Sequence, residues 1–177
     1  MNYLELKTPV KKDAKWFVEL RNAMASEGIP VRWQSGSFHI TAVFIYEDHP
    51  VEELKSAFSR CLTGRKVPSL TLDKLDAFTT KNDIIVNITA SKPSESLTAL
   101  IEEIRTEAAS RGVDLRQSFL LHITLGRIDV AAATLPKVKK IIDSIAITPF
   151  TLNIMKVNYR YYRGRIIQTW HLNNTIK

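Results

Sequence analysis

Two short segments of this chain resemble each other at a nearly constant separation, and this internal similarity restricts the folds that the chain can adopt. Gly28-Ile29-Pro30-Val31-Arg32 and Gly112-Val113-Asp114-Leu115-Arg116 both contain glycine, a β-branched residue, any residue, an aliphatic residue and arginine. His39-Ile40-Thr41 and His122-Ile123-Thr124 follow them, with the two histidines 83 residues apart. The 177 residues are therefore predicted to hold two copies of one unit, with almost no linker.

Each half of the chain carries the signals of two helices. Apolar residues recur at helical spacing, and N-cap, proline and glycine residues stand at the expected ends. The predicted helices run from an N-cap at Asp13 to Gly28, from Pro50 to Gly64, from Ser94 to Gly112, and over residues 135–145.

The remaining segments are typical of strands, because they are rich in aromatic and β-branched residues or alternate in polarity. They comprise residues 3–7, 38–45 and 119–128, a hairpin of 70–78 with 84–90, and a hairpin of 151–159 with 165–172.

Together these elements predict one α+β domain over residues 1–177, built from two lobes. The lobes cover roughly residues 10–90 and 93–175, each with the order helix, strand, helix, hairpin, and the strand in residues 1–9 joins a sheet. We expect antiparallel sheets, a pseudo-two-fold axis between the lobes and an active cleft there. The alternative is one mixed α/β sheet in which the halves resemble each other by chance.

The two triplets supply the most distinctive candidate site. Residues i and i+2 of a strand point to the same face, so His39 projects with Thr41, and His122 projects with Thr124. A single His-x-Thr on a strand is usually structural. Two copies at equivalent positions of a duplicated unit predict that both imidazoles and both hydroxyls converge in one cleft.

Such a set suits phosphodiester cleavage without a metal. Two imidazoles can serve as general base and general acid near neutral pH, and two hydroxyls can donate hydrogen bonds to phosphate oxygens. The sequence has no HxH, HxxxH or HExxH spacing and no GxSxG turn, so neither a metal site nor a serine hydrolase is indicated. No cofactor is expected.

His39-Ile40-Thr41-Ala42 and His122-Ile123-Thr124-Leu125 resemble the paired motifs of the 2H phosphoesterase superfamily, which includes the RNA 2′,3′-cyclic phosphodiesterases, also called 2′-5′ RNA ligases. Val31-Arg32-Trp33, the stretch 119–127 and Trp170-His171-Leu172 are similar to the same family. Ala42 departs from the leucine that the family usually has there. The resemblance implies a bilobal α+β fold, proton roles for the two histidines and phosphate contacts for the two threonines.

Three further residues are weaker candidates for substrate binding. Arg127 contacts phosphate or forms a surface ion pair; strict strand alternation gives it the wrong face, unless Gly126 introduces a bulge. Trp33 stacks on a base or packs at the cleft mouth. Tyr161 belongs to an interleaved set of tyrosines and arginines that can stack on nucleobases, or that can form an amphipathic hairpin edge.

Composition narrows the partners. The formal net charge of +7 favours an anionic partner, which we expect to be an RNA end or a nucleotide. With one cysteine, no apolar stretch of membrane-spanning length and no signal-peptide pattern, the sequence predicts a soluble cytoplasmic protein without membrane contact. No obligatory protein partner is evident.

These observations predict a metal-independent enzyme that hydrolyses a 2′,3′-cyclic phosphate at an RNA end or on a related nucleotide, with ligation as the reverse reaction. One alternative is a noncatalytic RNA- or nucleotide-binding module. Another is a 2H enzyme that acts on a different small cyclic phosphodiester, such as a cyclic phosphate of ADP-ribose.

Overall fold

Four helices and ten strands form within residues 1–173, the part of the chain that the computed structural model describes. In chain order they are β1 (Asn2–Lys7), α1 (Lys15–Ser26), β2 (Arg32–Trp33), β3 (His39–Ile45), α2 (Val51–Leu62), β4 (Ser69–Leu72), β5 (Lys74–Thr79), β6 (Asp83–Thr89), α3 (Glu95–Ser110), β7 (Ile123–Asp129), α4 (Leu135–Asp143), β8 (Phe150–Asn153), β9 (Lys156–Tyr161) and β10 (Ile166–His171). The α+β class with antiparallel sheets is confirmed.

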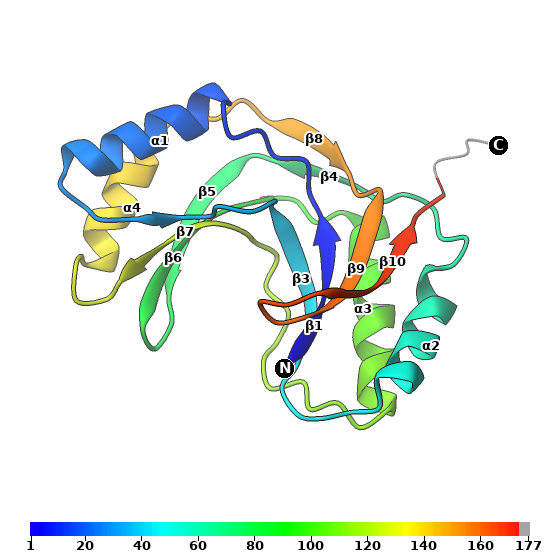
Figure 1. Cartoon of the computed structure of the whole chain (residues 1–177). Helices are drawn as coiled ribbons and strands as arrows, with labels where there is room; N and C mark the ends of the chain where they lie inside the picture. The colour runs from blue at the N-terminus through cyan, green and yellow to red at the C-terminus, as the bar shows by residue number, and fades with distance from the viewer. Residues whose placement is uncertain (174–177) are drawn as a thin grey trace.

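Two four-stranded sheets hold most of the strands (Figure 1). The first sheet has the order β10-β9-β1-β3, the second has the order β2-β7-β6-β5, and β4 pairs with β8 in a separate ribbon. Each sheet therefore combines strands from both halves of the chain. The sheets do not coincide with the sequence halves 10–90 and 93–175, whose boundaries and duplication remain predictions.

The helices pack on one face of each sheet, at opposite ends of the molecule in Figure 1. In the first sheet, the ring of Tyr159 lies 5.4 Å from that of Phe58 in α2. In the second sheet, Trp33 packs edge-on against Phe17 of α1, with 5.6 Å between the ring centroids. We call the opposite face of each sheet, turned away from its helices, the inner face. No helix among residues 1–173 has the length and apolar composition to span a membrane.

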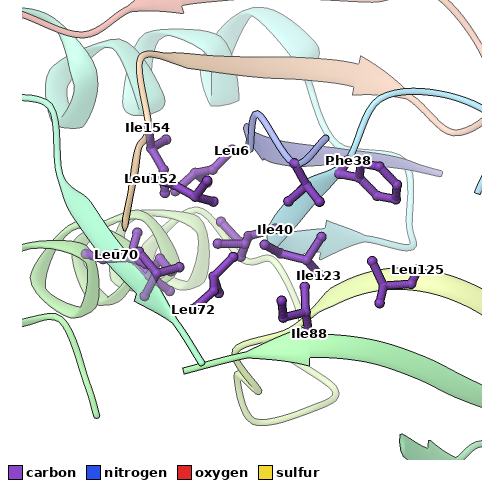
Figure 2. Packing of buried hydrophobic residues seen from close by; sticks show 14 of the residues in the cluster. Leu6, Phe38, Ile40, Leu70, Leu72, Ile88, Ile123, Leu125, Leu152 and Ile154 are labelled. Carbon is purple, nitrogen blue, oxygen red and sulfur yellow. The ribbon is translucent and has the colours of Figure 1, made fainter. Parts of the chain in front are cut away.

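The two sheets meet where β3 contacts β7. β3 is an edge strand of the first sheet, and β2 pairs with β7 at Arg127 and Gly126, beyond the first residues of β7. Ile40 and Ile123, the middle residues of the two triplets, are fully buried and lie near each other in the core (Figure 2). Packing at this junction therefore fixes the two triplets relative to each other.

Both triplet strands contain a β-bulge immediately after the threonine. Thr41 pairs with Glu5 and Val43 with Leu4, which leaves Ala42 as the extra residue. Thr124 pairs with Asn87 and Gly126 with Val86, which leaves Leu125 as the extra residue. Ala42 and Leu125 are 83 residues apart, as the two histidines are. A duplicated unit would produce this correspondence.

Several predicted boundaries are correct. Ser94 caps α3, since its side chain accepts a hydrogen bond from the backbone N–H of Leu97. Gly28 and Gly112 follow their helices with φ of +69° and +85°, a backbone conformation that side chains with a Cβ disfavour. Both predicted hairpins form, as β5 with β6 and as β9 with β10.

Other predicted boundaries are wrong. The N-cap of α1 is Ala14 rather than Asp13. The strand predicted over 119–128 begins only at Ile123, so His122 immediately precedes it. The first arm of each hairpin is split into two strands, because β4 and β8 pair with each other before the chain enters β5 and β9. At the first split, Asp73 leaves the ribbon and accepts a hydrogen bond from the backbone N–H of Ser91.

Candidate active site

Strand pairing places the first triplet on the inner face of the first sheet. Directly paired residues share a face, and Tyr159 and its partner Leu4 face the helices. Glu5 and Lys7 therefore belong to the inner face, together with their partners Thr41 and His39.

The second triplet lies on the inner face of the second sheet by the same reasoning. Gly126 is packed against Trp33 on the helix side, so its partner Val86 also faces the helices. Asn87 then points inward, and so does Thr124, which pairs with it. His122 contacts Phe78 edge-on, with 5.1 Å between the ring centroids, and Phe78 shares this inner face.

A buried carboxylate lies behind His39. Nδ1 of His39 is 3.4 Å from Oε2 of Glu5, whose side chain is only 1% exposed. The opposite edge of the imidazole, which carries Nε2, is the one turned away from Glu5. His39 itself keeps 23% of its side chain exposed, so a ligand on the inner face can reach it.

His122 is held by the backbone instead. Its Nδ1 lies 2.8 Å from the carbonyl oxygen of Leu120. A carbonyl only accepts hydrogen bonds, so Nδ1 carries the hydrogen and Nε2 of the neutral ring is left as the basic atom. This is the tautomer that a general base acting through Nε2 requires.

Burial is the main cause that lowers the pKa of both imidazoles. For His39, the carboxylate of Glu5 acts in the opposite direction, while Lys7 lowers the pKa further. For His122, the Leu120 backbone contact raises the pKa and the charge of Arg127 lowers it. Both histidines therefore have cationic neighbours, and only His39 also has an anionic neighbour among the groups that shift its pKa.

The hydroxyl groups of Thr41 and Thr124 are free to bind a ligand. Both residues are half-buried, and within residues 1–173 neither side chain makes a hydrogen bond. Thr89 and Thr169, also half-buried, instead donate to Leu121 and Asn158. The two triplet threonines thus present unused donors on the inner face.

Arg127 shares the inner face with Thr124 because of the bulge at Leu125. It pairs with Ile85, two residues from Asn87, so both pairs point inward. Its guanidinium lies 3.8 Å from Asp83, which also binds Arg32 at 2.6 Å. For Arg127, the sequence leaves a surface ion pair and a phosphate contact as alternatives. In the structure the two are compatible, because the arginine that pairs with Asp83 also lies on the inner face.

Trp33 and Tyr161 are not brought to the inner face. Trp33 packs toward Phe17 on the helix side of the second sheet. Tyr161 pairs with Asn2 and lies two residues after Tyr159 on β9, so it points to the helix side as Tyr159 does. We leave both residues out of the proposed site.

Sequence reasoning missed the polar residues that surround His39. Glu5, Asn158 and Arg160 form a hydrogen-bonded group below the imidazole, with Glu5 and Asn158 almost completely buried. Alternation along residues 3–7 identifies the strand, but it predicts solvent exposure for its polar residues. Only the pairing of β1 between β3 and β9 shows that Glu5 is central in a sheet. Within residues 1–173, no group of three or more His, Cys, Asp or Glu side chains is arranged to hold a metal ion.

Comparison with known proteins identifies the class. The profile of the 2′-5′ RNA ligase superfamily matches residues 12–165, and the chain belongs to this superfamily, the 2H phosphoesterases that the paired motifs resemble. The family supports a phosphoesterase or ligase role.

Individual relatives agree with this assignment. An RNA 2′,3′-cyclic phosphodiesterase from Thermotoga maritima is 25% identical over 169 residues, which covers 94% of this chain and 86% of the relative. The crystal structure of E. coli LigT complexed with 3′-AMP matches with a TM-score of 0.64 at 19% identity, over 98% of both chains. The TT0787 protein of Thermus thermophilus matches with a TM-score of 0.62 at 12% identity, over 98% of this chain and 99% of that one. The two structures establish the shared fold.

Proposed function

We propose that this chain is a metal-independent phosphodiesterase that hydrolyses a 2′,3′-cyclic phosphate at an RNA end or on a related nucleotide. The observation that carries the proposal is that each His-x-Thr pair lies on the inner face of its sheet and that the two strands involved, β3 and β7, contact each other. The proposed catalytic residues are His39 and His122, and Thr41 and Thr124 bind the phosphate.

The chemistry needs one proton acceptor and one proton donor. One histidine takes a proton from a water molecule while the oxygen of that water attacks phosphorus. The bond from phosphorus to one ribose oxygen then breaks. The other histidine gives its proton to that ribose oxygen. The threonine hydroxyls donate hydrogen bonds to the non-bridging oxygens, where negative charge grows in the transition state. Exact reversal of these steps re-forms the cyclic phosphate and releases water. Ligation is therefore not the reverse of this hydrolysis: the hydroxyl of a second RNA end has to attack phosphorus in place of water, and the same ribose oxygen leaves.

Charge on the inner face suits this substrate class. Lys7 and Arg160 lie beside His39, and Arg127 lies near enough to His122 to lower its pKa. Cationic side chains around the site attract a negatively charged phosphodiester and offset its charge once it is bound. The Thermotoga relative is named for RNA 2′,3′-cyclic phosphates, and LigT structures hold 3′-AMP, NADP+ and ATP, which supports a nucleotide ligand for this chain.

A turnover screen with excess EDTA tests the proposal. It compares 2′,3′-cyclic mononucleotides, an oligonucleotide ending in a cyclic phosphate, and ADP-ribose cyclic phosphate, with His39→Ala as the inactive control. We expect hydrolysis of at least the oligonucleotide or the mononucleotides. Binding of these ligands without turnover would favour the noncatalytic module, and turnover of the ADP-ribose compound alone would favour the other small phosphodiester.

A further inference from the structure

Glu5 is a fully buried charged residue on β1, one of the two middle strands of the first sheet. Removing a carboxylate from water is strongly unfavourable unless it is paired and hydrogen-bonded. One of its oxygens, Oε1, meets that need: it lies 3.3 Å from Nζ of Lys7, 3.2 Å from Nδ2 of Asn158 and 3.4 Å from a guanidinium nitrogen of Arg160.

The second oxygen, Oε2, has a different environment. It is buried and makes no hydrogen bond within residues 1–173, but Nδ1 of His39 lies 3.4 Å away. Hydrogen bonds to catalytic groups are often long before substrate binds and shorten afterwards. Oε2 of this buried anion thus faces His39. The hydroxyl of Tyr3 is a further polar group beside the carboxylate, and burial, followed by the charge of Glu5, raises the pKa of that tyrosine.

The carboxylate is ionised where it lies. Burial alone would raise the pKa of Glu5, but His39, Asn158, Lys7 and Arg160 together hold it below its ordinary value of 4.5. A cationic imidazole beside this anion is stabilised, although Lys7 on the same strand as Glu5 and Arg160 on β9 oppose part of the effect. The ring of Tyr3 also faces His39, at 6.0 Å.

The second sheet has no such anion at the corresponding place. Thr41 pairs with Glu5, whereas Thr124 pairs with the neutral Asn87. The backbone of Ser37 favours protonated His39 much as that of Leu120 favours protonated His122, and cationic side chains oppose protonation at both sites, so the carboxylate is the anionic contribution that His39 has and His122 lacks.

We propose that Glu5 is a positioning residue for His39: it binds Nδ1–H, turns Nε2 toward the inner face and favours the protonated ring. His39 then gives its proton to the leaving ribose oxygen, and His122, with Nε2 unprotonated, takes the proton from water. This inference rests on the proposed function for the identity of the reaction.

The test is an NMR titration of the imidazole nitrogens in the full-length wild type and in Glu5→Gln, which keeps the side-chain shape and removes the charge. The titration midpoint of His39 should move to lower pH in Glu5→Gln, while that of His122 stays. In the wild type, neutral His39 should be the Nδ1–H tautomer. An unchanged His39 midpoint, or an Nε2–H tautomer in the wild type, would overturn the proposal.

Kinetics supply the second readout. In Glu5→Gln, kcat should fall roughly ten- to a hundredfold with little change in KM, as when a partner that orients a functional histidine is lost. The alkaline limb of the pH profile should move to lower pH. The matched control is Glu103→Gln, which removes an exposed carboxylate of α3 that is paired with Arg65. This variant should leave both readouts unchanged.

Two features keep the outcomes separable. If Glu5→Gln does not fold, Glu5→Asp keeps the charge at a shorter reach and should show a smaller shift of the same sign, and an unchanged His39 midpoint there would also contradict the proposal. If the wild type hydrolyses no cyclic phosphate, the proposed function fails, while the titration still decides whether Glu5 controls His39.

Discussion

Both imidazoles are half-buried, and this sets the pH at which the proposed pair works. Burial lowers the pKa of His39 and of His122 below the ordinary histidine value of 6.5. The general base becomes active as pH rises through its lowered pKa, and the general acid loses its proton above its own.

We therefore predict a bell-shaped profile of kcat/KM whose optimum lies on the acidic side of neutrality. The measurement is kcat/KM for a cyclic-phosphate substrate from about pH 4.5 to about pH 9 at constant ionic strength, a range that brackets histidine titration. A flat profile, or an optimum in alkaline solution, would contradict the assignment of both proton transfers to these histidines.

The free hydroxyls of the two threonines are a second feature at the scale of single residues. Thr41→Val and Thr124→Val keep the β-branched shape and remove only the donor. Each should lower kcat by about a hundredfold if it removes one hydrogen bond to the transition state. Thr71→Val is the control, because the Thr71 hydroxyl pairs with that of Thr151 on the separate β4–β8 ribbon. Equal, small losses in all three variants would show that the triplet hydroxyls do not bind the phosphate.

At the scale of elements, the bulge at Leu125 and the close packing at Gly126 determine to which side of the sheet each residue of β7 points. A Cβ at Gly126 would lie 2.7 Å from Cγ1 of Val31 and 2.8 Å from Cε3 of Trp33, closer than atoms pack. Gly126→Ala should therefore cost about 1–3 kcal/mol of unfolding free energy, the usual range for overpacking.

Urea unfolding of this variant beside Gly36→Ala measures the effect. A Cβ at Gly36 meets no atom within 4 Å, so this control should be nearly neutral. Equal stabilities for the two alanine variants would mean that β2 and β7 do not approach each other as described.

The same bulge shows how far the elements follow from sequence. Apolar periodicity and end signals predict all four helices and both hairpins, because those signals are local. Arg127 is different: its face depends on a register shift between β6 and β7, and alternation alone assigns it to the wrong side. Gly126 is the one residue in the sequence that hinted at the shift.

At the scale of the whole molecule, the sequence does not show which strands of one half pair with strands of the other half. The repeat predicts the content of each half, but a period does not say which strands pair. β9 and β10 complete the sheet of His39, and β5 and β6 complete the sheet of His122. Glu5 gains its role only through this pairing, since Asn158 and Arg160 come from β9, at the far end of the sequence. His39, Thr41, His122 and Thr124 could be proposed without it, because the motif itself repeats.

The central claim is that His39 and His122 act together as one acid–base pair without a metal ion. The most direct measurement is kcat of the wild type, His39→Ala, His122→Ala and the double variant on a cyclic-phosphate-ended oligonucleotide in excess EDTA. Each single variant should lose roughly a thousandfold, within the range for general acid–base catalysis, and the double variant should be little worse, because the two residues act as a unit. Near-normal turnover by either single variant, or wild-type activity that is lost in EDTA and restored by a divalent ion, would contradict the claim.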